Sequence, residues 1–456
     1  MISLSLQTVA DNLNATLSGG DTVFTGCSTD TRSIKKGELF VALHGPSFDG
    51  HDYLGVAEEA GASAVMIDQD VKTNLPTLRV ENTRRALGDL ATIWRQQFKM
   101  PVVAITGSNG KTTVKEMLNS ILSRCGNVLA TRRNLNNEIG VPQTLFNLDP
   151  QHDFAIIEMG ANHAGEIARL CEMAIPMVAV VTQCSPAHLE GFGTIENVAL
   201  AKGEIFESLA KEGIAIINAD DKFSPLWEQM AGECQIIRFG LQEAADITAS
   251  IISVNTKSSH FQLKAPGEEI DLKLSLPGRH NIMNALAAAA CAKALDIPLK
   301  DIRDGLEALQ GVPGRLQFKS GDQKCQIIDD TYNANPGSFS AALDVLINST
   351  GRHWLALGDM GELGESAEDL HEDAGELARQ AGVERLFTIG QLSQKAAQAF
   401  GAGAEHFTDH AEMIEKIKSI KKESDKDITL LIKGSRAAKM ETVVQALESE
   451  HASDSG

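Results

Sequence analysis

The 456-residue sequence has few basic side chains, few aromatic side chains and no long apolar run. Its 41 Lys and Arg face 61 Asp and Glu, which leaves a formal net charge of −20. Because a negative field repels phosphate backbones, we do not expect the protein to bind nucleic acid. The 16 Phe, 3 Trp and 2 Tyr residues are also too few for a platform on which single-stranded bases stack.

Cysteine pairs and targeting signals are missing as well. The seven cysteines are scattered and none lies in a C-x-x-C pair, which argues against a disulfide framework and against a zinc-cysteine site. No apolar run approaches the roughly 20 residues that cross a bilayer. The first residues lack the basic segment of a signal peptide. We therefore expect a soluble, unprocessed cytoplasmic protein without a membrane span.

The length allows for about three folding units at roughly 150 residues each. We expect them over residues 1–82, 83–312 and 313–456, with the Gly- and Pro-rich segment 310–314 as a boundary and a hinge. Apolar runs alternate with helical patterns, which predicts parallel sheets. The predicted strands cover 38–43, 64–67, 102–106, 154–158, 178–182, 214–218, 326–329, 354–357, 386–389 and 429–432.

The segment 247–276 follows a different pattern. Its apolar residues alternate around a Pro266-Gly267 turn, which predicts an antiparallel hairpin. The predicted fold class is therefore α/β with three domains. These are a small N-terminal α/β domain, a central domain with a parallel sheet plus antiparallel hairpins, and a C-terminal Rossmann-like domain.

A phosphate-binding loop is the strongest local signal. It lies between the strand predicted at 102–106 and a helix, and it reads Gly107, Ser108, Asn109, Gly110, Lys111, Thr112, Thr113. Backbone N–H groups and the helix N-terminus can bind phosphate, Lys111 can reach the β- and γ-phosphates, and Thr112 can bind Mg²⁺. The longer consensus has glycine where this chain has Ile105. The alternative is a Gly-rich turn that precedes Lys and Thr by chance.

Three further residues are candidates for the same sheet edge. Glu158 ends the next predicted strand, where a carboxylate can bind Mg²⁺, although it could also point into solvent. His188 follows the strand at 178–182, and Lys202 lies on the helix after that loop. Taken alone, these two are more typical of polar surface. The chain has no N-K-x-D motif, which favours adenine over guanine nucleotide.

Motifs at both ends of the chain extend this pattern. The first unit contains Ser28-Thr29-Asp30-Thr31-Arg32 and Phe48-Asp49-Gly50-His51. The third contains Asp329-Asp330-Thr331-Tyr332-Asn333-Ala334-Asn335-Pro336, Leu357-Gly358-Asp359-Met360-Gly361-Glu362-Leu363-Gly364 and Lys433-Gly434-Ser435-Arg436. With the central motifs, they resemble the Mur ligases of peptidoglycan synthesis over essentially the whole chain. That family also has the shorter G-x-x-G-K-T-T loop, which accounts for Ile105.

The resemblance implies an ADP-forming, ATP-dependent ligase with a central P-loop ATPase domain. The D-D-T-Y-N-A-N-P form is typical of the type that joins D-alanyl-D-alanine to UDP-N-acetylmuramoyl tripeptide through an acyl phosphate. ATP and Mg²⁺ are the expected cofactors, and we expect a monomer. The implied catalytic residues are Lys111, Glu158, His188 and Lys202. The implied metal ligands are Thr112, Glu158, His188 and Lys202, the last one if it is carbamylated.

The resemblance also assigns binding roles. Residues expected to bind ATP are Gly107, Ser108, Asn109, Gly110, Lys111, Thr112, Thr113, Asn281, Asn284, Arg315 and Asp330. Residues expected to bind substrate are Ser28, Asp30, Arg32, Asp49, His51, Asn136 and Asn137. Taken alone, Asp49-Gly50 could be a turn and Asn281 a helix N-cap.

Two other functions stay open on the sequence. A folylpolyglutamate-type or cyanophycin-type ligase would use the same ATPase core, although the first-unit motifs argue against it. A non-catalytic, ATP-gated binding protein could use the same cleft. Whether the third residue of the tripeptide is diaminopimelate or lysine is also undecided.

Overall fold

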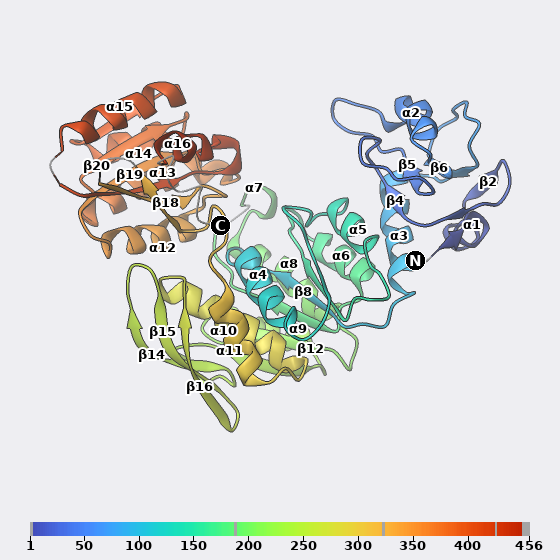
Figure 1. The fold of residues 1–456 in the computed structure, drawn as a ribbon, viewed down its shortest axis with the longest axis horizontal. Helices are drawn as coiled ribbons and strands as arrows, with labels where there is room; N and C mark the ends of the chain where they lie inside the picture. The colour runs from blue at the N-terminus through green and yellow to red at the C-terminus, as the bar shows by residue number, and fades with distance from the viewer. Residues whose placement is uncertain (1–2, 187–188, 322–323, 425, 449–456) are drawn as a thin grey trace.

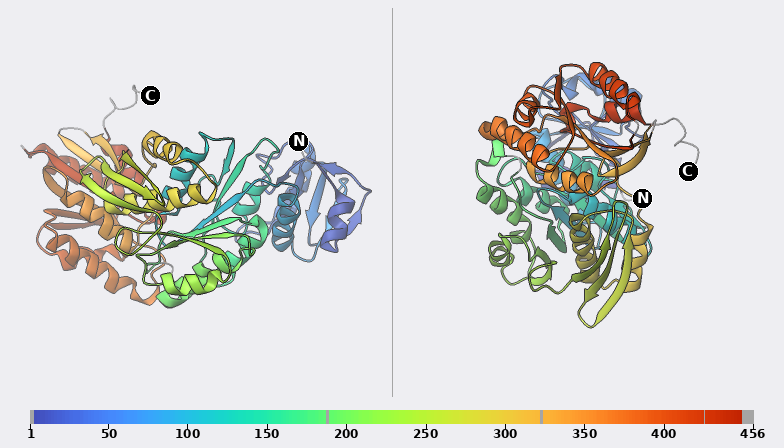
Figure 2. Two further views of the ribbon diagram at one scale, coloured as in Figure 1. Left: turned by 90° about the horizontal axis from the view of Figure 1, so that it is seen from below. Right: turned by 90° about the vertical axis from the view of Figure 1, so that its left-hand side faces the viewer.

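The computed structural model describes residues 3–186, 189–321, 324–424 and 426–448. Three sheet-containing units follow one another along the chain (Figure 1). Seen from below, the molecule is elongated, with the N-terminal unit at one end and the C-terminal unit at the other (Figure 2). Across the described ranges, no helix is both long and apolar enough to cross a membrane.

The N-terminal unit is built on a five-stranded sheet in the order β2-β7-β6-β5-β4. Its strands are β2 (Thr16–Ser18), β4 (Cys27–Ser28), β5 (Leu39–Val41), β6 (Ala64–Ile67) and β7 (Thr77–Arg79). All pairs are parallel except β2 with β7. The other elements are β1 (Leu4–Ser5), α1 (Leu6–Leu13), β3 (Val23–Phe24), η1 (Gly50–Tyr53) and α2 (Leu54–Glu59).

The central unit contains a six-stranded, all-parallel sheet in the order β13-β12-β11-β8-β10-β9. Its strands are β8 (Val102–Thr106), β9 (Val128–Ala130), β10 (Phe154–Glu158), β11 (Val178–Val181), β12 (Ile214–Asn218) and β13 (Gln235–Phe239). The helices are α3 (Thr83–Arg95), α4 (Lys111–Leu122), α5 (Gly140–Leu145), α6 (Glu166–Ala174), α7 (Leu189–Phe192), α8 (Ile195–Glu207), α9 (Ser224–Ala231), α10 (Arg279–Ala294) and α11 (Leu299–Ala308).

Where the sequence predicts a hairpin, the structure has a three-stranded antiparallel sheet. It consists of β14 (Thr248–Val254), β15 (Ser259–Ala265) and β16 (Glu268–Leu274), and the turn at Pro266 and Gly267 joins the last two. The extra strand β14 lies at the edge of this sheet and is largely exposed, so its apolar alternation is weak.

The C-terminal unit is a six-stranded sheet in the order β17-β18-β22-β19-β20-β21, with β17 antiparallel and the others parallel. Its strands are β17 (Gln317–Gly321), β18 (Cys325–Asp330), β19 (Arg352–Gly358), β20 (Arg385–Ile389), β21 (Ala404–Phe407) and β22 (Ile428–Lys433). The helical elements are α12 (Pro336–Ile347), η2 (Gly364–Ser366), α13 (Ala367–Gln380), α14 (Ser393–Phe400), α15 (His410–Lys422), η3 (Arg436–Ala438) and α16 (Glu441–Leu447).

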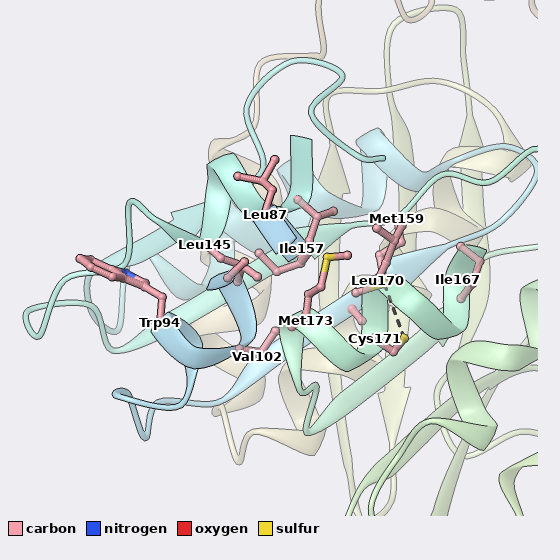
Figure 3. Packing of buried hydrophobic residues seen from close by; sticks show 14 of the residues in the cluster. Leu87, Trp94, Val102, Leu145, Ile157, Met159, Ile167, Leu170, Cys171 and Met173 are labelled. Carbon is pink, nitrogen blue, oxygen red and sulfur yellow. Dashed lines mark hydrogen bonds between the residues drawn. The ribbon is translucent and has the colours of Figure 1, made fainter. Parts of the chain in front are cut away.

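The boundaries between the hydrophobic cores do not coincide with the boundaries between the three sheet-containing units. One cluster of buried side chains runs from the N-terminal sheet through α3 into the central unit. Figure 3 shows the part of this cluster in which Leu87 and Trp94 of α3 lie among residues of the central unit. Trp94 on α3 connects the two units, because its ring lies 6.5 Å from Phe24 of β3 and 6.0 Å from Phe146, which follows α5. The C-terminal unit has two clusters of its own. The first unit therefore shares the core on one face of its sheet with the central unit, and a small separate cluster that includes Phe40, Leu54 and Val65 packs on the other face.

Candidate functional site

The loop after β8 has the geometry that the sequence predicts for phosphate binding. β8 is buried along its whole length, and α4 begins at Lys111. Gly107 and Gly110 have φ values of +146° and +84°, and a Cβ atom at either position would collide with Thr182 or Asn284. Both positions therefore require glycine, which frees backbone N–H groups to face an anion.

Lys111 is folded onto this loop. Its ammonium donates to the backbone oxygens of Gly107 at 2.6 Å and of Ser108 at 3.4 Å. Burial lowers the pKa of Lys111, which the charge of Glu158 opposes and that of Arg315 reinforces. The loop therefore holds a desolvated cation at the point where phosphate oxygens would approach.

Glu158 ends β10 and is 1% exposed. Its Oε1 accepts a hydrogen bond from Asn136 Nδ2 at 2.9 Å, and its backbone N–H donates to Thr131 Oγ1. The other oxygen, Oε2, is buried and has no partner among the described residues. Burying an unpaired carboxylate oxygen is costly, and a divalent cation that prefers oxygen ligands would relieve that cost. The position therefore fits Mg²⁺.

Lys202 on α8 is the second unusual charge near the loop. It is 2% exposed, and burial lowers its pKa from the usual 10.5 to about 7, with the positive charge of Lys111 adding to the effect. A large fraction of the amine is therefore neutral near neutral pH. His188, the other predicted ligand here, lies outside the described residues.

A cavity of about 420 Å³ opens beside the phosphate loop. The central unit lines it with Asn109, Gly110, Thr113, Asn281 and Asn284, and the C-terminal unit with Arg315, Asp330 and the first turn of α12. Asn281 Nδ2 donates to the Pro277 oxygen at 2.7 Å, so this amide also braces the start of α10. The structure thus brings several of the predicted nucleotide residues, from two units, together around one cavity.

Arg315 and Asp330 reach the site from the C-terminal unit. The Arg315 guanidinium lies 4.1 Å from the centre of the Tyr332 ring, and its Nη2 donates to Thr112 Oγ1 at 3.2 Å. Asp330 pairs with the buried ammonium of Lys433 and accepts a hydrogen bond from the Leu316 N–H. Tyr332 and Lys433 belong to motifs that the sequence singles out, but no sequence signal gives these contacts.

A pair of amides also joins the two units. Asn335, at the N-cap of α12, donates through Nδ2 to Asn109 Oδ1 at 2.8 Å, and Asn109 Nδ2 donates back to Asn335 Oδ1 at 3.2 Å. Asn109 Nδ2 also donates to Ser185 Oγ. The C-terminal unit is therefore docked directly on the phosphate loop.

The candidate substrate residues of the first unit lie at the edge of the N-terminal sheet. Asp30 and Arg32 form an ion pair at 2.7 Å with 40% and 88% of their side chains exposed, and Ser28 Oγ donates to the Asp30 backbone oxygen. Asp49 Oδ1 lies 2.6 Å from His51 Nδ1. Hydrogen bonds from the His51 backbone and ring lower the pKa of Asp49 to about 2.

Asn136 and Asn137 have structural partners of their own. Asn136 holds Glu158, whereas Asn137 Oδ1 accepts hydrogen bonds from the backbone N–H groups of Ile139 and Gly140 at the start of α5. Both side-chain amides therefore have hydrogen-bond partners within the protein. Their expected contact with substrate stays a prediction.

Three family models match the chain. Their descriptions are Mur ligase family, catalytic domain, for residues 23–95, Mur ligase middle domain for 105–292, and Mur ligase, glutamate ligase domain, for 314–436. The chain belongs to the Mur ligase family.

Individual relatives match over nearly the whole length. The UDP-N-acetylmuramoyl-tripeptide--D-alanyl-D-alanine ligase of Escherichia coli (strain K12) is 46% identical over 449 residues, which cover 98% of this chain and 99% of the relative. The crystal structure of MurF from Acinetobacter baumannii has a TM-score of 0.92 at 36% identity and covers 98% of both chains. MurF ligase from Thermotoga maritima in complex with ADP has a TM-score of 0.81 at 28% identity and covers 92% of this chain and 96% of that one.

Proposed function

We propose that this chain is an ADP-forming, ATP-dependent ligase that joins D-alanyl-D-alanine to UDP-N-acetylmuramoyl tripeptide in peptidoglycan precursor synthesis. The observation that carries the proposal is the full-length similarity, at 46% identity, to a ligase of that name. The phosphate loop beside a buried, half-satisfied Glu158 supports the ATP-dependent step independently.

The reaction has two steps. A carboxylate oxygen of the tripeptide attacks the γ-phosphorus of ATP, the bond to the β-phosphate oxygen breaks, and ADP leaves. The amine of D-alanyl-D-alanine then attacks the acyl carbon, and phosphate leaves as the amine gives up a proton. Both steps develop negative charge, which cations in a site shielded from water stabilise.

Lys111 is the proposed partner of the β- and γ-phosphates, and Arg315 and Asp330 close on the nucleotide from the C-terminal unit. Thr112 and Glu158 are the proposed ligands of a first Mg²⁺, supported by the unpartnered Glu158 oxygen. Bound Mg²⁺ would supply neutralisation of phosphate charge. Asn136 holds Glu158 in a fixed orientation, which leaves one oxygen for the metal.

Lys202 is proposed to act as a carbamate. Its neutral amine adds CO₂ and releases a proton, which turns a cation into a carboxylate-like ligand for a second Mg²⁺, together with His188. The pKa of about 7 supports this role, because only the neutral amine reacts with CO₂. A buried cation beside Lys111 would otherwise be unfavourable.

The N-terminal unit is the proposed binder of the nucleotide sugar, through Ser28, Asp30, Arg32, Asp49 and His51. Asn136 and Asn137 are proposed to line the path of the acceptor. We place the functional domains at 1–82, 83–312 and 313–456, with 310–314 as a hinge. A cytoplasmic location is proposed because the substrates are those of cytoplasmic precursor synthesis, and the monomeric state stays an expectation from the sequence.

Phosphate release from ATP tests the function. Release should require the tripeptide nucleotide and D-alanyl-D-alanine together, and release that is indifferent to the dipeptide would refute the proposed acceptor. Lys111→Ala should abolish ligation while nucleotide binding is partly retained, whereas the surface variant Lys211→Ala should behave as wild type. Running the assay with the diaminopimelate and the lysine tripeptide decides the third residue.

The two alternatives are weaker. Folylpolyglutamate synthase from Mycobacterium tuberculosis is 17% identical with a TM-score of 0.66, which indicates a shared fold alone. A non-catalytic, ATP-gated binder would bind substrates without releasing phosphate, so the same assay separates it from the ligase.

A further inference from the structure

A second cluster of metal-binding side chains lies far from the phosphate loop, at the edge of the N-terminal sheet. His44 follows β5, His51 lies in η1, and Asp68 directly follows β6. Parallel strands end at this edge, so the loops after β5 and β6 converge there. A backbone bridge pairs His44 with Asp49, which brings the loop containing His51 over the end of β5.

The three side chains present their ligand atoms to one point. Asp68 Oδ1 lies 3.0 Å from His44 Nε2 and 3.3 Å from His51 Nε2, and all three atoms lie within 4.8 Å of one another. Ligands held about 2.0–2.2 Å from a tetrahedral Zn²⁺ are about 3.3–3.6 Å apart. Little movement is therefore needed to place a metal ion between them.

The outer contacts of these ligands are also those of a metal site. Asp49 faces the second nitrogen of both rings, with Oδ1 at 2.6 Å from His51 Nδ1 and Oδ2 at 3.4 Å from His44 Nδ1. The N–H and Oγ1 of Thr83 both donate to Asp68 Oδ2 at 3.1 Å. Each ligand is thus oriented through its outward atom while the inward atom stays directed at the common point, as outer partners of bound metals do.

We propose that His44, His51 and Asp68 bind one divalent transition metal of the Zn²⁺ class, with Asp49 and Thr83 as orienting partners. Two neutral imidazoles and one carboxylate leave a fourth position open for water or an anionic oxygen. The His44 side chain is 52% exposed, which gives a metal ion access, whereas His51 is 2% exposed. This site shares His51 and Asp49 with the proposed binding surface for the nucleotide sugar, but metal binding is measured on the free chain and is therefore separable from ligase activity.

The competing arrangement is a metal-free hydrogen-bond network. In it, the Asp68 N–H donates to His51 Nε2 at 3.3 Å, which is long for such a bond. A bound metal ion would take that nitrogen in place of the amide. The two arrangements differ in metal content and in the stability of the N-terminal unit when metal is added.

The test is a titration of the untagged full-length chain with Zn²⁺, read by calorimetry and by metal content after dialysis. Co²⁺ serves as a spectroscopic probe, because tetrahedral coordination gives intense visible bands. We expect one equivalent at this site and a rise in Tm with added Zn²⁺. His44→Ala and Asp68→Asn should remove that equivalent, and Asp49→Asn should weaken binding by about 10–100-fold.

Matched controls exclude other sites. His163→Ala removes an exposed histidine that is also paired with a carboxylate, and Glu158→Gln removes the candidate ligand in the nucleotide cleft. Both variants should retain the tetrahedral Co²⁺ spectrum. The proposal is overturned if wild type lacks that spectrum, or if His44→Ala and Asp68→Asn bind Zn²⁺ as wild type does while their Tm without metal is unchanged.

Discussion

The charged candidate residues at the edge of the central sheet and those at the edge of the N-terminal sheet differ in how deeply they are buried and in whether their charges are paired. At the central edge, Glu158 and Lys202 are 1% and 2% exposed, and one Glu158 oxygen has no partner in the described parts of the chain. At the N-terminal edge, Asp30 is half-buried and Arg32 is exposed, and the two charges neutralise one another. Buried charges without full compensation cost stability, so the central edge is built for ligands that supply the missing partners. At the N-terminal edge, Asp30 and Arg32 already have partners and contact solvent, so substrate can replace water there without first stabilising a buried charge.

Glu158→Gln should have the largest effect, because it removes the buried charge that distinguishes the central edge from the N-terminal edge. The amide keeps the shape and the Asn136 contact but removes the charge that Mg²⁺ needs, so we expect kcat to fall by about 10²–10³-fold. The free energy of unfolding should stay equal or rise, because a buried charge is lost. Steady-state phosphate release and urea denaturation measure the two effects.

A substitution at the edge of the N-terminal sheet serves as the comparison for Glu158→Gln. Asp30→Asn should raise KM for the nucleotide sugar without changing the free energy of unfolding. A large loss of stability in Glu158→Gln, or a kcat close to wild type, would contradict the account of the central edge.

Lys202→Met tests the buried cation through pH. The pKa is about 7 in the folded protein and near 10.5 when exposed, so below pH 7 both states are protonated and the burial cost is present in full. Between pH 7 and 10.5 the unfolded state keeps a proton that the folded state has released, so wild-type stability rises with pH. Lys202→Met lacks that rise and should be the more stable protein at about pH 6.5.

Urea denaturation in CO₂-free buffer at several pH values measures this difference. Arg32→Met, at the exposed edge, should give a pH profile parallel to that of wild type. A Lys202→Met profile that also runs parallel to wild type would show that burial does not depress this pKa.

Asn335→Asp should have the smallest of the three effects. Aspartate keeps the oxygen that caps α12 by accepting from the Ser338 N–H, but it loses the donor to Asn109 and sets oxygen against oxygen. We expect about a tenfold loss in kcat/KM for ATP, which is about 1.4 kcal/mol. Asn348→Asp, at the other end of α12, is the control. Equal kinetics for the two variants would show that the pair of Asn109 and Asn335 does not contribute to docking of the C-terminal unit.

How far the sequence predicts the fold depends on burial. The ranges of β8, β10 and β12 are predicted correctly, because these strands are apolar runs buried within the sheet. β9, β13 and β21 are missed. All three lie at sheet edges. β9 is only three residues long, whereas β13 and β21 are largely half-buried and contain polar residues, so their patterns are weak.

The site divides in a similar way. The phosphate loop is predictable because its backbone requires glycine at fixed spacing. The pairing of Asn109 with Asn335 spans 226 positions, and only the docking of two units brings these amides together. His44 and Asp68 give no signal in the sequence, since a single histidine and a single aspartate after strands are common and their convergence depends on the sheet register.

The position of Trp94 between Phe24 and Phe146 bears on how the molecule melts. The N-terminal and central sheets share one core cluster through α3, although each also has a separate cluster on its other face, whereas neither cluster of the C-terminal sheet is shared with another unit. Heat should therefore unfold the first two units in a single cooperative step and the third in a separate one. In calorimetry, ATP should draw the two transitions together, since a nucleotide in the shared cavity contacts both cooperative units.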